Sequence, residues 1–369
     1  MHMRVLVLNA GSSSVKIRVL DAADAVLAAH DLPAQGGRFD QRALAELLRG
    51  LPPVEAVGHR IVHGGDVFTH SVAVDDQVEE RLRGLTDLAP LHQPAGLAAM
   101  DVVRRVAPGI PGVACFDTAF HAHLPPESST YAVPAEWRER FGVRRFGFHG
   151  LAYTYVARRA AQLLRRPLGT LRLVLCHLGA GASLAAVRAG VSVDTTMGFT
   201  PLDGLVMATR VGSLDPGLVL WMQQHAGLSA ADVGDALEHR SGLFALAGTG
   251  DMRQVLDAVD AGNAAAALAV AVYVHRLRAG VAAMAATMDG CDALVFSGGV
   301  GEHAAAIRER AVVGLGFLGV GVDATRNAVA AGCDADISAD GARVPTLVVV
   351  AREDMEIARE VRAVLGRRG

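Results

Sequence analysis

The sequence is poor in cysteine, nearly neutral in charge and without long hydrophobic runs at its start. Its four cysteines lie far apart and form no Cys-x-x-Cys pair. This spacing argues against a disulfide framework and against a cysteine zinc site, and it fits a reducing cytosol. The formal net charge is −3 at pH 7, so nothing in the charge points to nucleic acid or to an anionic membrane surface as a partner.

The apolar segments are too short for a leader or a membrane span. The first apolar run, Val5 to Leu8, ends at Asn9, so no signal peptide is expected. The best membrane candidate, Ala264 to Val274, is followed by a histidine and two arginines, which favours a buried Ala-rich helix. With 369 residues, 51% of them hydrophobic and 20% charged, the chain is expected to form two soluble, cytoplasmic domains with sizeable cores.

The first motif is a strand, a glycine-serine turn and a second strand. Val5 to Leu8 has the pattern of a buried strand, and residues 15–19 alternate between apolar and basic side chains. The turn between them holds one glycine and three serines, which expose backbone N–H groups to a phosphate. An ordinary solvated turn has the same composition. It is not a Walker A loop, because no Gly-Lys-Ser/Thr follows and a strand comes next.

Two later segments return to glycine turns. Residues 171–187 repeat the order strand, glycine turn, strand, and this repetition predicts an internal duplication. Residues 292–303 predict a strand, a Gly-Gly turn and the start of a helix, which suits close packing against an adenosine, with simple packing as the alternative. Residues 21–55 are expected to be loop-rich, with one helix at 41–51.

Charged residues stand at the ends of two further predicted strands. Arg60, beside two histidines, is a candidate anion site, and Asp117 lies where open α/β sheets place catalytic groups. A surface arginine and a helix cap are the alternatives. Residues 144–150 concentrate cations and aromatic rings. The long turn-rich segment 194–217 has an aliphatic content that argues against disorder and favours a functional loop.

At least seven of these motifs, in this order, closely resemble the acetate kinase family, and the resemblance covers nearly the whole chain. That family belongs to the group of actin, sugar kinases and Hsp70-type ATPases. The resemblance implies an α/β fold of two duplicated actin-like ATPase (ribonuclease H-like) domains with a nucleotide cleft between them. It places the first domain at residues 1–118 plus 354–369 and the second at 119–353, and it implies a homodimer.

The resemblance also implies a reaction: Mg²⁺-dependent transfer of the γ-phosphoryl group of ATP to acetate, with Mn²⁺ as an alternative metal. Arg60 would grip the substrate carboxylate, Arg210 would stabilise the phosphoryl group in transit, and His149 would donate to its oxygens. The residue that matches Asp117 is the acid/base of the family. Because acetate needs no base, orientation of Arg60 or of a metal-bound water is the alternative role. Positioning and charge neutralisation are expected to dominate catalysis.

The remaining site residues are carried over by the same resemblance. The pocket for the substrate methyl would comprise Val62, Leu91, Phe148 and Pro201, and the metal would be held at Asn9 and Glu353. The nucleotide would contact Ser12, Ser14, Lys16, His177, Leu178, Gly179, Ala180, Gly181, Asp251, Met252, Arg253, Gly299, Val300, Gly301, Glu302 and His303. Ala180 departs from the family, in which asparagine is usual at this place.

Three other functions share these motifs or this fold. A kinase for propionate or another short-chain fatty acid would differ only in pocket volume, and Val62 has the size expected for acetate. A non-catalytic or chaperone-like ATP-binding protein would need none of Arg60, Asp117, His149 and Arg210. A phosphatase that hydrolyses acyl phosphate or polyphosphate would keep the fold without an acid acceptor.

Overall fold

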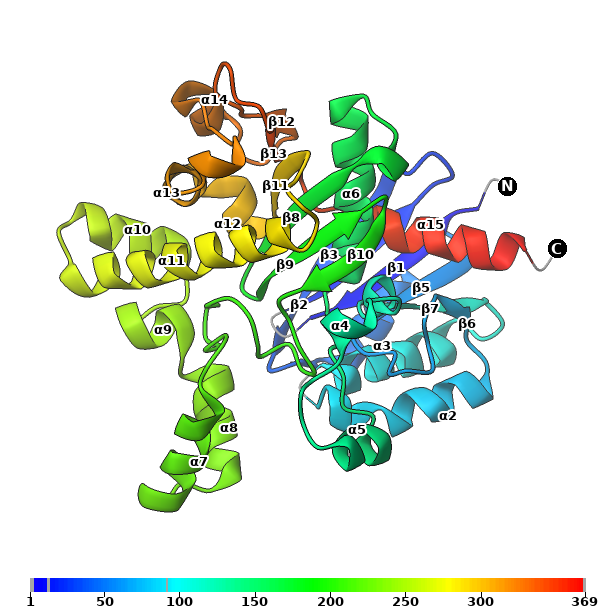
Figure 1. The fold of residues 1–369 in the computed structure, drawn as a ribbon. Helices are drawn as coiled ribbons and strands as arrows, with labels where there is room; N and C mark the ends of the chain where they lie inside the picture. The colour runs from blue at the N-terminus through cyan, green and yellow to red at the C-terminus, as the bar shows by residue number, and fades with distance from the viewer. Residues whose placement is uncertain (1–2, 12–13, 91, 368–369) are drawn as a thin grey trace. The chain divides into compact units, whose positions relative to one another are not determined.

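A computed structural model describes residues 3–11, 14–90 and 92–367. The chain divides into two compact units. The first comprises Met1–Ala122, Phe148–Tyr155 and Arg352–Gly369, and the second comprises His123–Gly147 and Val156–Ala351. The domain boundaries at residues 118 and 353 stay a prediction. Figure 1 shows the course of the chain through both units.

The first unit is built on a seven-stranded sheet with the order β4-β3-β2-β1-β5-β7-β6. Strands β1 to β4 form an antiparallel meander, β1, β5 and β7 run parallel, and β6 is antiparallel at the edge. The strands are β1 (Val5–Ala10), β2 (Ser14–Leu20), β3 (Val26–Gln35), β4 (Arg38–Phe39), β5 (Ala56–Ile61), β6 (Val72–Ala73) and β7 (Gly112–Phe116).

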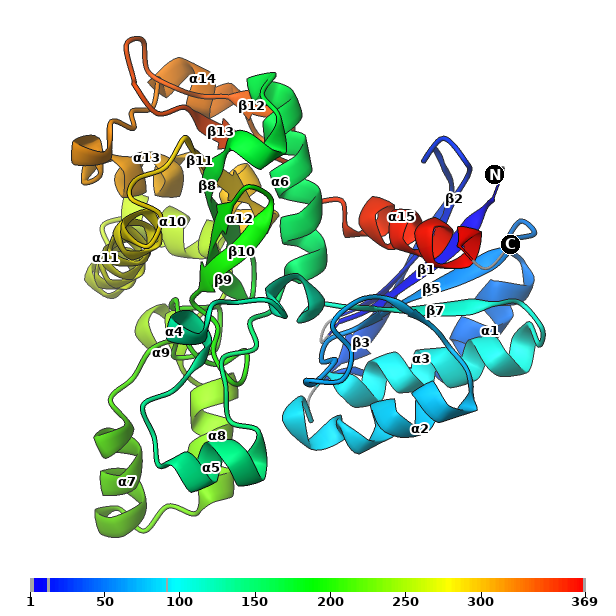
Figure 2. The same ribbon diagram turned by 45° about the vertical axis from the view of Figure 1, so that its right-hand side comes forward.

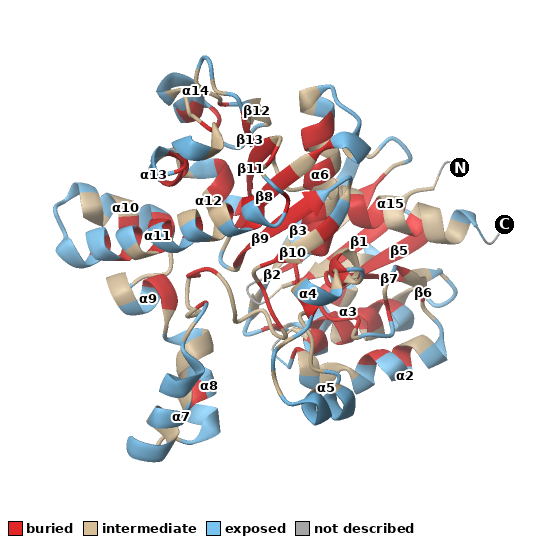
Figure 3. Cartoon of the chain, viewed as in Figure 1, coloured by how far each residue is buried: buried red, intermediate tan, exposed pale blue. Residues whose placement is uncertain are grey.

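Both faces of this sheet are covered by helices because β1 is apolar on both sides. Leu6 and Leu8 pack against α1 and α3, whereas Val5 and Val7 pack against α15 and the start of α6. Figure 2 shows α3 and α15 on opposite faces, and Figure 3 shows the central strands buried. The helices are α1 (Gln41–Arg49), α2 (Asp76–Gly84), α3 (Gln93–Val106) and α15 (Glu353–Gly366), with 3-10 turns at Thr86–Leu88 and Ala119–His121.

The second unit repeats this topology in a six-stranded sheet with the order β10-β9-β8-β11-β13-β12. An antiparallel meander, β8 to β10, is again followed by parallel strands β11 and β13 and an antiparallel edge strand. The strands are β8 (Arg172–Leu178), β9 (Ala182–Arg188), β10 (Val191–Thr195), β11 (Ala293–Ser297), β12 (Ala335–Asp336) and β13 (Thr346–Val348). The shared strand order confirms the predicted duplicated α/β fold.

Helix α6 (Gly150–Leu164) begins in the first unit and continues into the second. The other helices of the second unit are α4 (Pro126–Ser129), α5 (Ala135–Phe141), α7 (Pro216–His225), α8 (Ala230–His239), α9 (Gly242–Ala247), α10 (Met252–Asp260), α11 (Ala264–Ala286), α12 (Gly298–His303), α13 (Ala305–Val313) and α14 (Ala324–Val329), with 3-10 turns at Leu168–Thr170 and Gly316–Leu318.

Helix α11 is long and apolar enough to cross a membrane, and it is the one such helix in the described part of the chain. It packs against α9, α10 and α13 and against strands β8 and β9. Its buried residues include Val270, Tyr273 and Leu277. These contacts bury one side of α11 against the rest of the second unit.

Candidate active site

Four polar side chains of the first unit form one network at the ends of neighbouring strands. Asn9 comes from the end of β1, Arg60 from β5, Asp117 from the turn after β7, and Glu353 from the first turn of α15. Strands β1, β5 and β7 are parallel neighbours, so their carboxyl ends meet at one edge of the sheet. The sequence predicted all four residues as site residues.

Arg60 is the centre of this network. Its Nε and Nη2 atoms donate to Asp117 Oδ2 over 3.0 and 2.5 Å, and Nη1 donates to Asn9 Oδ1 over 3.1 Å. Asn9 Nδ2 in turn donates to Glu353 Oε2 over 2.5 Å. The side chains of Arg60 and Asp117 are 13% and 1% exposed. A guanidinium held on two sides in this way is fixed in direction, which suits recognition of a planar carboxylate.

Burial and neighbouring charge act in opposite directions on this pair. Burial alone would lower the pKa of Arg60, but the carboxylates of Asp117 and Glu353 outweigh it and raise that pKa. For Asp117, burial raises the pKa above its ordinary value, the guanidinium of Arg60 opposes this rise, and the charge of Glu353 adds to it. The site therefore holds two carboxylates against one guanidinium, and a further cation would relieve their repulsion.

The donor set fits a hard divalent cation such as Mg²⁺. Asp117 Oδ1 is buried and has no hydrogen-bond partner among the residues that the structure describes. Together with Glu353 and Asn9 it offers oxygen ligands of the type that Mg²⁺ takes. Across the described ranges, no group of three His, Cys, Asp or Glu residues could hold a metal ion. A magnesium ion here would therefore keep several ligands from water or from substrate phosphates.

A tight backbone contact places Phe148 and His149 next to Asp117. The Gly150 N–H donates to the Asp117 carbonyl over 2.9 Å, and a Cβ at Gly150 would lie 2.3 Å from that oxygen, so only glycine fits. His149 adopts a left-handed conformation with φ of 60°. Phe148 is buried, and its ring contacts His63 edge to face. Residues 148–150 are thus fixed to the turn after β7 that holds Asp117.

Two other predicted residues of this unit lie close to the network in the chain. Val62 directly follows β5 and is buried. Lys16 is exposed on β2, directly opposite Asn9 in the antiparallel pair β1–β2. In the turn between them, the Gly11 N–H donates to the Ser14 carbonyl over 2.9 Å. Ser12 and Leu91, which the sequence also predicts as site residues, lie outside the described residues.

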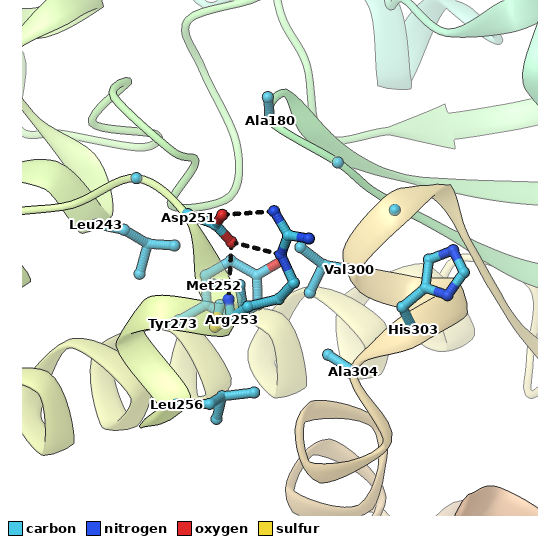
Figure 4. A pocket seen from close by; sticks show the side chains of 13 residues that line it. Ala180, Leu243, Asp251, Met252, Arg253, Leu256, Tyr273, Val300, His303 and Ala304 are labelled. Atoms are coloured by element: carbon cyan, nitrogen blue, oxygen red, sulfur yellow. Dashed lines mark hydrogen bonds and ion pairs between the residues drawn. The ribbon is translucent and has the colours of Figure 1, made fainter. Parts of the chain in front are cut away.

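The second unit contains a cavity of about 580 Å³ (Figure 4). Three segments that the sequence assigns to the nucleotide line it: the glycine turn after β8, the start of α10 and the start of α12. Its wall is mostly apolar with a few polar groups, as expected of a small-molecule pocket. The lining residues are Gly179, Ala180, Leu243, Gly250, Asp251, Met252, Arg253, Leu256, Tyr273, Gly299, Val300, His303 and Ala304.

Glycine is required where two of these segments meet. Gly298 has φ of +77°, and a Cβ there would lie 2.9 Å from the backbone of Leu178. The turn that opens α12 can therefore lie directly on the end of β8, next to Gly179 and Ala180. The Ala180 carbonyl accepts from the Ala208 N–H over 3.0 Å, which fixes this hairpin turn against the loop 194–217.

Asp251, which also lines the cavity, caps α10 and binds Arg253. Asp251 Oδ1 accepts from the Arg253 backbone N–H over 2.9 Å, and Oδ2 accepts from Nη2 over 2.7 Å (Figure 4). The Arg253 side chain is 86% exposed. It therefore forms the solvent side of the pocket rather than its floor.

Some predicted nucleotide residues do not line the cavity, and some lining residues were missed. His177, Leu178, Gly181, Gly301 and Glu302 are absent from the described lining. Leu256, Tyr273 and Ala304 line it without having been predicted. They are single apolar or aromatic residues at helical positions in α10 and α11 and after α12, and such residues carry no local signal of ligand binding.

Arg210 and Pro201, from the loop 194–217, also lie in the second unit. Arg210 Nε is 3.1 Å from Glu238 Oε2, and Nη1 donates to the Pro201 carbonyl over 3.3 Å. The loop thus places one predicted catalytic arginine beside one predicted substrate-pocket residue.

The comparison with known families decides which family carries these two sites. A family model described as "Acetokinase family" matches residues 39–359. The chain belongs to the acetokinase family. Apart from the first motif at residues 5–19, the motifs that the sequence analysis found lie within the matched range.

Several relatives and solved structures are similar to this chain over most of its length. It is 42% identical over 400 aligned positions to an acetate kinase from Gloeobacter violaceus, covering 97% of this chain and 98% of the relative. An acetate kinase from Microcystis aeruginosa is 43% identical over 338 positions, covering 90% and 84%. The structure matches an acetate kinase from Porphyromonas gingivalis at a TM-score of 0.91 and 34% identity, over 98% and 100% of the two chains. It also matches a propionate kinase from Francisella tularensis at 0.91 and 32%, with the same coverage.

Proposed function

We propose that this protein is an acetate kinase, which transfers the γ-phosphoryl group of ATP to acetate and forms acetyl phosphate and ADP. The observation that carries the proposal is the buried Arg60–Asp117 pair with Asn9 and Glu353 beside it. A protein that only binds nucleotide has no need of a guanidinium held in this way. The family membership and the acetate kinases among its relatives support the same function.

The reaction asks an anion to approach a polyanion, so charge and position limit its rate. Acetate is ionised at neutral pH and attacks without losing a proton. Arg60 would bind its carboxylate, and Asp117 would hold Arg60 in the required direction. Arg210 and His149 would stabilise charge on the phosphoryl oxygens during transfer. Asp117 is then a positioning residue, and no general base is needed.

The nucleotide would bind at the cavity of the second unit with its base against Leu243, Met252 and Val300. Mg²⁺ would be held through oxygen atoms of Asp117, Glu353 and Asn9, and it would neutralise phosphate charge when bound. Lys16 would add a mobile cation for the phosphates. The resemblance also supports a cytoplasmic location and a homodimer. Light scattering of the purified protein would test the homodimer.

A kinase for propionate is the second candidate, because one of the matching structures is a propionate kinase. Val62 has the size expected for acetate, and both Val62 and Phe148 are buried. One methylene is worth about 1–3 kcal/mol, so we expect acetate to be preferred by roughly 10–200-fold in kcat/KM.

A coupled assay of ADP release separates these functions. With ATP and Mg²⁺, ADP should appear with acetate, more slowly with propionate, and hardly at all without an acid. Equal ADP release without any acid would indicate a hydrolase. Absence of ADP under all three conditions would leave a non-catalytic ATP-binding protein.

A further inference from the structure

Helix α12 lines the cavity, and its glutamate, Glu302, has a buried carboxylate that binds backbone groups of the protein. Glu302 is 8% exposed. A single oxygen, Oε1, accepts two backbone N–H groups, that of Gly298 over 2.8 Å and that of Ala351 over 2.9 Å. Gly298 is the first residue of α12 and opens the turn that carries the lining residues Gly299 and Val300. The Glu302 carboxylate therefore binds backbone groups of the protein, and hydrogen bonds to a carboxylate are strong.

Ala351 belongs to the segment that leads from β13 to α15. Its neighbour Val349 donates its N–H to the Phe296 carbonyl of β11 over 2.9 Å, which continues the pairing of β13 with β11. Two residues after Ala351 comes Glu353, the first residue of α15 and a member of the polar network with Asn9. One carboxylate oxygen therefore binds both the start of a cavity-lining helix and the segment that carries Glu353.

The other end of α12 is held by a buried arginine. Arg308 of α13 has no exposed surface, and its guanidinium donates to the carbonyls of Gly301 and Glu302 over 2.9 and 3.0 Å. It also donates to Asn327 Oδ1 and to the Asn327 carbonyl, each over 2.7 Å. With both ends bound, α12 cannot shift without changing the bonds of Glu302. A displacement or stiffening of the helix is then passed to Ala351.

We propose that Glu302 is a positioning residue that couples occupancy of the cavity to the order of the segment Ala351–Glu353. The proposal rests on the proposed function, because it takes the occupant to be an adenine nucleotide. A ligand that stiffens α12 stiffens the Glu302 carboxylate and, through it, the Ala351 N–H. By thermodynamic reciprocity, loss of the hydrogen bond to Ala351 lowers the affinity of the cavity for its ligand.

Asp334 offers a matched control, because its carboxylate binds the backbone next to the segment Ala351–Glu353. Its Oδ1 accepts the N–H of Val350, the residue before Ala351, over 2.9 Å, and its Oδ2 pairs with Arg159. Asp334→Asn thus removes a carboxylate that holds the same stretch of backbone through Val350 and Arg159, whereas that of Glu302 also binds α12. Glu302→Ala removes the coupling, and Glu302→Gln keeps an acceptor oxygen while removing the charge.

The experiment uses the full-length protein with ADP as the probe and a chelator in place of any metal. Hydrogen exchange of the backbone amides of residues 349–353 is followed with and without ADP, and the Kd of ADP is measured by calorimetry. We expect ADP to protect these amides in the wild type and in Asp334→Asn. In Glu302→Ala the protection should disappear and the Kd should rise roughly tenfold to a hundredfold, for a lost charge-assisted bond. Glu302→Gln should lie between.

The outcomes separate the two hypotheses. A wild type that does not bind ADP overturns the proposed function and this coupling with it. A wild type that binds ADP while Glu302→Ala retains full protection at residues 349–353 overturns the coupling alone. Equal losses in Glu302→Ala and Asp334→Asn would show that any contact with the segment suffices, and would overturn the specific role of Glu302. If Glu302→Ala does not fold, the comparison of Glu302→Gln with Asp334→Asn decides between the same results.

Discussion

Replacement of Asp117 tests whether this carboxylate orients Arg60 or acts as an acid/base. Asp117 is 1% exposed, and its Oδ2 accepts two N–H groups of Arg60. Removal of one partner of a buried ion pair costs about 3–5 kcal/mol, because the other charge stays buried without compensation. Glu353 also interacts with Arg60 and remains in the variant. We therefore expect Asp117→Ala to lose about 3 kcal/mol of unfolding free energy, at the lower end of this range.

Urea unfolding of Asp117→Ala, Arg60→Ala and the double variant measures this coupling. The double variant should be more stable than the sum of the two single losses predicts, because no uncompensated charge is left. Losses that simply add would refute the importance of the pair. In steady-state kinetics, Asp117→Asn still accepts from Arg60, so it should raise the KM for acetate more than it lowers kcat. A collapse of kcat at unchanged KM would instead show that Asp117 acts as an acid/base.

Four further predictions follow from single features of the chain. Lys16 is the one lysine of the chain, so an amine-reactive reagent should modify only this side chain and the α-amino group. Bound ATP should protect Lys16 from the reagent. Equal modification of Lys16 with and without ATP would show that it does not lie at the phosphate site. Ala180 lines the cavity, so Ala180→Asn should tighten ADP by about 1.5–3 kcal/mol in calorimetry, the worth of one hydrogen bond to a charged group. Val62→Ala should shift the ratio of kcat/KM from acetate toward propionate, mostly through KM, and an unchanged ratio would place Val62 outside the pocket. Burial lowers the pKa of His59, His63 and His121 to about 4, so the unfolded state binds more protons than the folded state between about pH 6.5 and 4. The unfolding free energy should therefore be highest above that window and fall through it by up to about 1.4 kcal/mol per pH unit and histidine. A flat pH profile would contradict this prediction for the three histidines.

Local patterns were sufficient for the strands that carry the polar network. The apolar run at Val5 and the alternation at residues 15–19 correspond to β1 and β2, and the repeated hairpin corresponds to β8 and β9. A charged residue at the end of a buried strand is only a candidate, because a surface arginine or a helix cap gives the same pattern. For Arg60 and Asp117 the roles came from the family resemblance, and parallel pairing of β5 with β7 brings the two residues together.

The same reasoning failed where structure depends on distant partners. Residues 21–55 were expected to be loop-rich, but Val26–Gln35 forms a ten-residue strand. Its composition is poor in β-branched residues and most of its side chains are exposed, so the strand depends on pairing with β2 rather than on its own propensity. Glu302 shows the same limit at a site. Its neighbours in sequence are cavity residues, yet its carboxylate binds Ala351, which is 49 residues away in the chain.

The one lysine of this protein and its arginines differ in the acceptors that their charged groups can bind. Lys16 is one of 35 basic residues, and all the others are arginine. Arg60 and Arg308 each use the planar fork to bind several fixed acceptors, a task that an ammonium group cannot perform with the same directionality. Lys16 is exposed on β2 opposite Asn9. A compact charge on a flexible stem can follow a phosphoryl group whose position changes during transfer, whereas a guanidinium suits an acceptor that stays in place. The single lysine therefore suits the mobile phosphoryl group of the proposed reaction, and Arg60 suits the fixed carboxylate of its substrate.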